Sequence, residues 1–296
     1  MIVITAPTAK IGGRVLERVL EGEEPVRVIA RDPAKLDPAT RARVEVVQGS
    51  HREAAVVDRA FAGADAVFWL VPADRLAATV DEAYSGFAQP GIAALVQHGV
   101  RHVVGVSALG RGTPVADRAG HVTATLAMDD LIAKTGVHYR ALANPSFMDN
   151  SLRDVPALKN GGVFGLPVPG DLRTPMVATR DIGDVAATLL RERDWTGVAE
   201  VPLLGPEDLS GEQLAAILTE VLGAPITYRQ TSAEDLRGAM TGFLSPAMVE
   251  AMVDMMVAKS QGLDRGVART AEISALTPTT FRAWCEQVLK PAYDAA

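Results

Sequence analysis

The chain has 296 residues, 48% of them hydrophobic and 22% charged, which is enough for one large domain or two medium ones with a sizeable core. The formal net charge of −7 argues against nucleic acid as the main partner, because phosphate binding needs a basic face. The apolar runs are too short to span a membrane, and a lone cysteine, Cys285, excludes an internal disulfide and a cysteine-based metal site.

The N-terminal segment MIVITAP predicts a strand, since it lacks the basic start and the long apolar stretch of a signal peptide. With no leader and a single cysteine, the expected location is the reducing cytoplasm. The five histidines do not have the spacing of metal ligands, so we expect no metal.

Short β-branched runs alternate with longer amphipathic stretches over the first 150 residues. The predicted strands cover residues 1–5, 26–30, 44–48, 66–71, 102–107 and 139–143. The predicted helices cover residues 12–20, 53–61, 79–97 and 123–134. This alternation is typical of βαβ units. We therefore predict an α/β fold in which residues 1–150 form a Rossmann-type, doubly wound parallel sheet.

The alternation loosens in the second half, and residues 151–296 are predicted to form a smaller, mostly helical lobe that is not cleanly separable from the first domain. Residues 159–171 are rich in glycine and proline, which predicts loop and turn. Because ligands bind outside the carboxyl ends of parallel strands, we expect this lobe to cover that edge and to select the substrate. Helices are predicted over 180–192, 211–222 (opened by a capping box of Ser210 and Gln213, closed by Gly223), 246–259 and 278–290.

The segment after the first strand is placed as a dinucleotide-binding loop would be, between a buried strand and a helix. In a GxxGxxG register its three positions are Ala6, Ala9 and Gly12, so one glycine is retained. Gly12 allows close helix–strand packing, whereas the Ala9 methyl lies near the expected pyrophosphate path. A purely structural turn is the alternative. The residues predicted to bind the pyrophosphate are Thr8, Ala9, Lys10, Ile11 and Gly12.

The second strand ends at Arg31 and Asp32, where the partner of the adenosine ribose normally lies. An acid would favour NAD, but Asp32 is expected to cap a helix that starts at Pro33. Arg31 suits a 2′-phosphate, and Lys35 adds a second charge. NADP(H) is therefore the predicted cofactor, with a merely solvated Arg31 as the alternative.

Three more strand ends lie at the same sheet edge and are predicted to contact adenine, ribose and nicotinamide in that order. An ordinary strand-end turn is the alternative for each of them. The residues are Gly49 and Ser50 after the third strand, Leu70, Val71 and Pro72 after the fourth, and Ser107 after the fifth. The turn that contains Pro145 and Phe147 is expected to border the nicotinamide.

These segments, in this order and spacing, resemble the NmrA-like group of atypical short-chain dehydrogenases, and within it the triphenylmethane reductase-like and quinone oxidoreductase-like branch. The resemblance rests on MIVITAPTAKIG, VRVIARDPAKL, VVQGS, GADAVFWLVP, GVRHVVGVSALG and KTGVHYRALANPSFMDN, and continues through TRDIGDVAATLL to LTPTTFRAWCEQVL. It implies NADP(H) binding, a small C-terminal lobe and reduction of quinones, dyes or related conjugated molecules. It also implies that some members sense dinucleotides and bind partners without catalysis.

The chain departs from this group in two places. Ala6 and Ala9 stand where the group has glycine, and Asn144-Pro145 replaces an Arg-Pro pair. Asn144 can still donate a hydrogen bond to the nicotinamide or the substrate, but it carries no charge.

No tyrosine is followed four residues later by lysine, so the proton relay of typical short-chain dehydrogenases is absent. Hydride transfer to an electrophilic acceptor needs mainly proximity and orientation. The predicted catalytic residues are Ser107, His121 and Asn144. For Ser107 and His121 the alternative is a capping role. The methionines at 248, 252, 255 and 256 suit either a flat ligand or a core or dimer interface.

The leading hypothesis is an NADP(H)-dependent oxidoreductase that acts on a conjugated small molecule. The second is a non-catalytic NAD(P) sensor that binds a protein partner. The third is a redox-neutral isomerase, cyclase or lyase, in which Ala6 and Ala9 have abolished dinucleotide binding. A homodimer is left open by the sequence.

Overall fold

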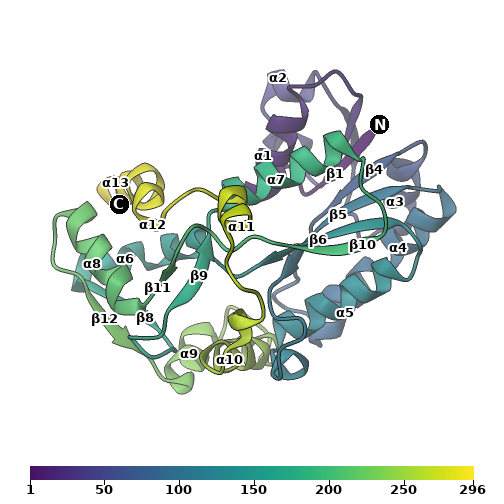
Figure 1. The fold of residues 1–296 in the computed structure, drawn as a ribbon. Coiled ribbons are helices and arrows are strands. Elements are labelled where there is room, and N and C mark those ends of the chain that lie inside the picture. Colours follow the sequence, from purple (N-terminus) through teal and green to yellow (C-terminus); the bar gives the residue numbers. More distant parts are fainter. The chain divides into compact units, whose positions relative to one another are not determined.

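A computed structural model describes residues 1–296, and its main feature is a seven-stranded parallel sheet of the Rossmann type (Figure 1). The strand order is β10-β6-β5-β4-β1-β2-β3. The strands are β1 (Ile2–Thr5), β2 (Val26–Ala30), β3 (Glu45–Gln48), β4 (Ala66–Trp69), β5 (His102–Ala108), β6 (His138–Asn144) and β10 (Val198–Pro202). From β1 the chain first builds β2 and β3 on one side and then crosses to β4, β5 and β6 on the other. Open α/β sheets bind ligands at the point where the strand order reverses in this way. The predicted fold class is confirmed.

Six of these strands lie where the sequence predicts them. Most of them are short apolar runs covered on both faces, whereas β3 stands at the edge of the sheet and only Val47 of its four residues is buried. Every residue of β1, β2 and β4 is buried. In Figure 1, α1 (Lys10–Val19) and α7 (Thr179–Glu192) cover one face of the sheet. The other face carries α3 (Ala54–Phe61), α4 (Phe87–Gln97) and α5 (His121–Ala133), while the short α2 (Pro38–Arg41) precedes β3.

The seventh strand, β10, was not predicted. Its sequence, VAEVP, contains a glutamate and a proline, and Val198 is 55% exposed. β10 stands at the end of the strand order, and edge strands carry charges and proline to block further pairing. Its pattern is therefore not the apolar run that marks a buried strand.

The chain forms two compact units. The first comprises Met1–Ala108, Ala124–Ala143 and Ile182–Val201, and it contains most of the sheet. The second comprises Leu109–Thr123, Asn144–Asp181 and Pro202–Ala296.

The second unit contains short strands as well as helices. β8 (Val163–Leu166) pairs in parallel with β12 (Thr227–Gln230). Residues 159–171 were predicted to be loop, which is wrong in part, since they hold the end of α6 (Val155–Gly161) and all of β8. Gly162 ends α6 in the left-handed conformation, and Phe164 then packs into the core at 1% exposure. A three-stranded sheet contains β7 (Ser146–Phe147), β9 (Thr174–Val177) and β11 (Asp208–Leu209).

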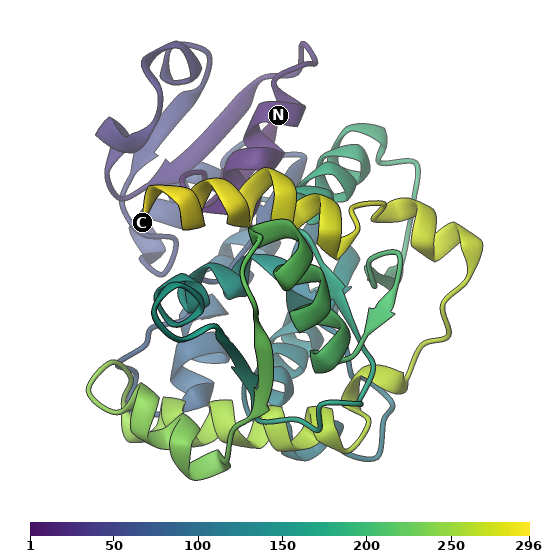
Figure 2. The same ribbon diagram turned by 90° about the vertical axis from the view of Figure 1, so that its left-hand side faces the viewer.

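The helices of the second unit have clear stop and start signals. The predicted capping box of Ser210 and Gln213 opens α8 (Gly211–Leu222), and Gly223 closes it at a φ of 69°. Figure 2 shows the C-terminal helices as one yellow rod that crosses α8, because a π-helical turn joins α12 to α13. The remaining helices are α9 (Ala233–Met240), α10 (Pro246–Ser260), α11 (Ala271–Leu276), α12 (Phe281–Trp284) and α13 (Lys290–Ala295). None of the helices in the chain is long and apolar enough to cross a membrane.

The packing of α4 on the sheet gives a test of this fold. A Cβ on Gly91 would lie 2.4 Å from Cη2 of Trp69, which is 1% exposed. Gly91→Ala should therefore lower the free energy of unfolding by about 1–3 kcal/mol through overpacking, despite the better helix propensity of alanine. The measurement is urea unfolding followed by circular dichroism.

Gly238→Ala is the matched control, since Gly238 also lies within a helix but has open space around it. It should raise the free energy of unfolding by up to about 1 kcal/mol. Equal stabilisation by both substitutions would contradict the close contact between α4 and Trp69.

Candidate functional site

The loop between β1 and α1 is held against the helix by backbone contact. A Cβ on Gly12 would lie 2.2 Å from the carbonyl oxygen of Ala6 and 3.1 Å from that of Thr5. Only glycine fits there, so the packing role predicted for Gly12 is confirmed. Ala6 has a φ of 49°, the left-handed conformation that glycine adopts most readily. The loop thus keeps a glycine-type path even though alanine occupies the position.

The N-terminus of α1 has no side-chain cap. Ala9 is the N-cap residue and cannot accept from the first-turn amides, and that turn holds no acid. Uncapped amides and the helix dipole favour an anion at this point. Thr8 and Lys10 are exposed beside it, whereas the side chain of Ile11 is buried in the core.

At the end of β2, the neighbouring charges of Arg31 and Asp32 have different roles. Asp32 accepts a hydrogen bond from the backbone N–H of Ala34 at 3.1 Å and caps the turn Pro33–Lys35, as predicted. Arg31 is exposed and forms no ion pair, and Lys35 is exposed at the end of the same turn. The positive charge of Arg31 is therefore available at the carboxyl edge of the sheet, while the carboxylate of Asp32 is already used.

The turn after β3 contains a residue that the sequence did not single out. Gly49 has a φ of 142°, and a Cβ there would lie 2.4 Å from Cγ2 of Val56. Ser50 follows and donates its N–H to Glu53 at 2.9 Å. His51 is 5% exposed, and its Nε2 lies 2.9 Å from the carbonyl oxygen of Leu70 at the end of β4. A histidine directly after a Gly-Ser turn was the available signal.

Burial holds His51 in its neutral form. Its ring meets those of Trp69 and Phe87 edge to face, with centroids 5.2 and 4.8 Å away. This burial lowers the pKa of His51 to about 4, with a smaller contribution from the charge of Arg31. Neutral His51 thus joins the ends of β3 and β4 through a hydrogen bond from Nε2–H.

The end of β4 is also joined to β1. Thr5 donates its hydroxyl to the carbonyl oxygen of Phe68 at 3.0 Å and accepts from the N–H of Leu70 at 2.9 Å. Val71 is half-buried and Pro72 is exposed beyond this link. The turn that contains Leu70, Val71 and Pro72 therefore begins at a residue, Leu70, that is hydrogen-bonded to Thr5 at the end of β1.

The end of β5 holds a buried polar network that the sequence did not predict. Ser107 donates its hydroxyl to Asp129 Oδ2, and Tyr139 donates to Asp129 Oδ1 at 2.5 Å. Ser107, Asp129 and Tyr139 are 5%, 2% and 1% exposed. A buried carboxylate with two hydroxyl donors has the compensation that a buried charge needs. The available signal was Asp129, which directly follows the apolar run from Leu126 to Met128 in the predicted helix.

Four predicted site residues belong to the second unit. Asn144 ends β6 at 4% exposure, and its carbonyl accepts from the N–H of Leu109 at 2.8 Å. Pro145 is buried after it, and Phe147 pairs with Val177 in β9. His121 begins α5 with Nε2 3.2 Å from the carbonyl oxygen of Met248, and burial lowers its pKa. Of the four methionines in α10, Met248 is buried, and Met252, Met255 and Met256 are half-buried.

The predicted residues of the first unit follow the carboxyl ends of neighbouring parallel strands, so they lie at one edge of the sheet. This edge combines a close backbone approach at Gly12, an uncapped helix N-terminus and an unpaired charge at Arg31. Those are the features that a pyrophosphate with an adjacent phosphorylated ribose needs. The fold and the site therefore define a Rossmann protein of the dinucleotide-binding class.

Comparison with known proteins agrees with this class. Residues 8–193 match the model of the NAD(P)H-binding family. The chain belongs to this family, and its resemblance to the NmrA-like atypical short-chain dehydrogenases is confirmed.

Individual relatives cover nearly the whole chain. The (4-alkanoyl-5-oxo-2,5-dihydrofuran-3-yl)methyl phosphate reductase of Streptomyces griseus is 30% identical over 286 residues, 96% of each chain. The NADPH-dependent quinone oxidoreductase of Escherichia coli, solved in complex with NADPH, superposes with a TM-score of 0.80 at 25% identity, covering 98% of this chain and 99% of that one. NmrA, a negative transcriptional regulator solved with NADP, has a TM-score of 0.72 at 15% identity, with 99% and 97% covered, which shows a shared fold.

The buried His51 makes a prediction about acid stability. Its folded-state pKa, about 4, lies below the ordinary value of 6.5, so the unfolded chain binds the proton more tightly. The stability that neutral His51 contributes is present above pH 6.5 and is lost as the pH falls toward 4. Wild type should lose roughly 2–3 kcal/mol more than His51→Gln across this window. Chemical denaturation at a series of pH values measures the difference.

His98→Gln is the control, because it removes another histidine and leaves His51 in place. It should retain the acid-sensitive step of the wild type. An equal loss in wild type and His51→Gln would contradict the assignment of a neutral, buried His51.

Proposed function

We propose that this protein is an NADP(H)-dependent oxidoreductase that reduces a conjugated small molecule, such as a quinone, a dye or an aromatic natural product. The observation that carries the proposal is the end of β2, where Asp32 caps a turn and Arg31 stays exposed and unpaired. The names of the relatives support reduction, since one is a reductase named for a dihydrofuranylmethyl phosphate and another is a quinone oxidoreductase.

The first unit supplies the residues that would hold the dinucleotide. The amides at the start of α1, with Thr8 and Lys10 beside them, suit the pyrophosphate. Arg31 and Lys35 suit the 2′-phosphate by charge, and Arg31 also suits the adenine face. Further contacts are proposed from Ala9, Ile11, Gly12, Gly49, Ser50, Leu70, Val71 and Pro72, and from Pro145 and Phe147 of the second unit. When bound, NADPH supplies a hydride to an electrophilic acceptor.

Ser107 is the proposed contact for the reacting end of the cofactor. Its hydroxyl donates to Asp129, which gives the side chain one fixed orientation near the carboxyl end of β5. Asp129 fixes this orientation and is itself held by Tyr139, so it acts as a positioning residue. Asn144 and His121 remain proposed catalytic residues of the second unit. No tyrosine–lysine pair is required, because water can protonate a reduced quinone or dye.

The cofactor assignment is tested by replacing Arg31. Arg31→Ala should weaken NADPH binding about tenfold or more and change NADH binding little, because only NADPH carries the 2′-phosphate. Titration calorimetry with each dinucleotide measures both affinities. Arg59→Ala is the matched control, since Arg59 is an exposed arginine in the last turn of α3, which leads into the amino end of β4 rather than the carboxyl strand ends.

Three outcomes decide among the hypotheses. Loss of NADPH affinity in Arg31→Ala alone, with turnover of quinones or dyes by wild type, supports the proposal. Tight binding with no turnover of either acceptor class favours a dinucleotide sensor. If wild type binds neither dinucleotide, the oxidoreductase proposal fails and a redox-neutral enzyme takes its place.

The role of Ser107 is tested by two substitutions in the same network. Ser107→Ala and Tyr139→Phe each remove one hydroxyl donor to Asp129. Ser107 lies near the carboxyl end of β5, whereas Tyr139 is the second residue of β6. Ser107→Ala should lower kcat about tenfold or more and leave the Kd for NADPH within about threefold, while Tyr139→Phe should mainly reduce stability.

Steady-state kinetics with a quinone acceptor, NADPH titration and thermal unfolding separate these effects. Equal losses of kcat in both variants would show that Ser107 acts only through the integrity of the network.

A further inference from the structure

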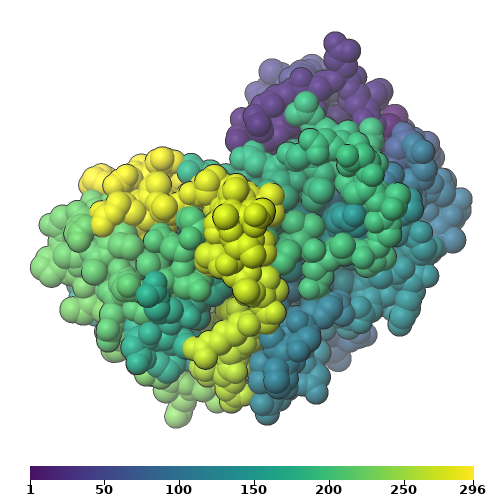
Figure 3. All heavy atoms as spheres, in the orientation of Figure 1, coloured from purple at the N-terminus to yellow at the C-terminus, as the bar shows by residue number.

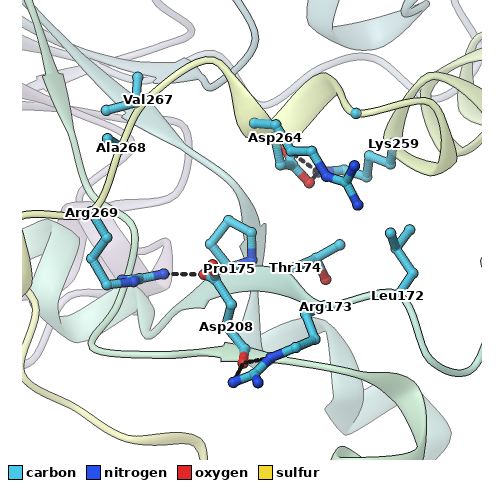
Figure 4. Close-up of a pocket in the computed structure, with 12 residues that line it drawn as sticks. Leu172, Arg173, Thr174, Pro175, Asp208, Lys259, Asp264, Val267, Ala268 and Arg269 are labelled. Atoms are coloured by element: carbon cyan, nitrogen blue, oxygen red, sulfur yellow. Dashed lines mark hydrogen bonds and ion pairs between the residues drawn. The ribbon is translucent and has the colours of Figure 1, made fainter.

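The second unit contains a cavity of about 250 Å³ whose lining is rich in charge. Figure 4 shows it between β9, β11 and the segment that follows α10. This segment, residues 261–270, lies at the surface and is yellow-green in Figure 3. The cavity lining contains four cationic side chains and two carboxylates. In a chain of net charge −7, such an excess of positive charge needs an explanation.

Two of the four cations are neutralised by ion pairs. Lys259 and Asp264 lie 2.8 Å apart, with side chains that are 7% and 4% exposed. Arg269 pairs with Asp208 and also donates to the carbonyl oxygen of Gly205. Figure 4 shows both pairs at the wall of the cavity. These four residues contribute no net charge to the lining.

The other two cations have no carboxylate partner. Arg173 donates through Nε and Nη2 to the backbone carbonyl of Asp208, at 3.1 and 2.9 Å, which orients its guanidinium without neutralising it. Arg265 is exposed and makes neither a hydrogen bond nor an ion pair through its side chain. The cavity therefore carries two uncompensated guanidinium charges.

The local backbone keeps Arg265 beside the cavity. Gly262 has a φ of 95° and starts the turn Leu263–Arg265, a conformation that favours glycine. Within this turn Asp264 is tied to Lys259, and the Arg265 Cδ lies 3.5 Å from the position of a Cβ on Gly262. Arg265 is thus presented by a turn that a buried ion pair holds in place.

We propose that this cavity binds a phosphate monoester through Arg173 and Arg265. Two guanidinium groups match the two negative charges of a phosphate monoester and its several acceptor oxygens. The volume lies just below the usual range for whole drug-sized ligands, about 300–1,000 Å³, so the cavity suits a small phosphate ester or the phosphorylated end of a larger molecule. The proposal concerns the second unit alone and does not rest on hydride transfer by the first.

Calorimetric titration with methyl phosphate tests the site, at constant ionic strength in a buffer free of phosphate and sulfate. Arg265→Gln should weaken binding about tenfold, and the double variant Arg173→Gln with Arg265→Gln should abolish it. Arg229→Gln is the matched control, because Arg229 is an exposed arginine of the same unit that does not line the cavity. Thermal unfolding checks that each variant is folded, and Arg265→Gln removes no internal partner. Equal affinity in wild type, Arg265→Gln and Arg229→Gln, or no binding by folded wild type, would overturn the proposal.

Two additional arms identify the source of the phosphate. Methyl phosphate binding that is unchanged by saturating NADPH supports a site separate from the dinucleotide. Competition by NADPH, with NADPH binding itself weakened in Arg265→Gln, would overturn the separate site. With an acceptor in phosphorylated and unphosphorylated forms, a KM increase in Arg265→Gln for the phosphorylated form alone supports a substrate phosphate. No change in either KM, with methyl phosphate binding still lost, supports a separate phosphorylated ligand.

Discussion

The contact between Gly12 and the loop before α1 is the constraint on which the candidate site depends. With a Cβ only 2.2 Å from the Ala6 carbonyl oxygen, any larger residue would push α1 away from β1. The contact requires a tight loop, and Ala6 accepts a left-handed φ of 49° to provide it, at a cost of about 1–2 kcal/mol for a residue with a side chain. In return, the uncapped N-terminus of α1 is held at the carboxyl edge of the sheet. Ala6 therefore carries a backbone strain that glycine at this position would not.

Polar side chains join the neighbouring strand ends at this edge. The Thr5 hydroxyl links β1 to β4, and neutral His51 links β3 to β4. Asp129 accepts hydrogen bonds from Ser107 near the carboxyl end of β5 and from Tyr139 near the start of β6. Each of these groups is buried and satisfied within the first unit, so the edge is rigid before a ligand binds. Arg31 is the exception, since it is exposed and without an ion-pair partner. An anion-binding site requires a positive charge that is not already neutralised by a carboxylate, and Arg31 provides one here. In the second unit, Arg265 provides another.

The fold could be predicted in its first half and only partly in its second. The strands β1 to β6 are short runs rich in β-branched and other apolar residues, a pattern that depends on nothing beyond the strand itself. β8 and β10 were missed, because β8 lies in a stretch rich in glycine and proline and β10 is a polar edge strand. At the site, the cap at Asp32 and the exposed Arg31 were predictable from their place after β2. Asp129 and His51 were not, since their partners lie 22 and 19 residues away.

The sequence by itself determined the α/β architecture, the helix caps, the place of the dinucleotide loop and the charge at the end of β2. These features depend on periodicity and on side chains within a few residues of each other. The tertiary structure alone decided which polar groups are satisfied. It brought the Ser107 hydroxyl within hydrogen-bonding distance of Asp129 and formed the ion pair between Lys259 and Asp264. It also left Arg173 and Arg265 without carboxylate partners. The physical reason is that desolvation and charge compensation are set by which groups the fold brings within hydrogen-bonding distance, and the local sequence pattern does not contain that information.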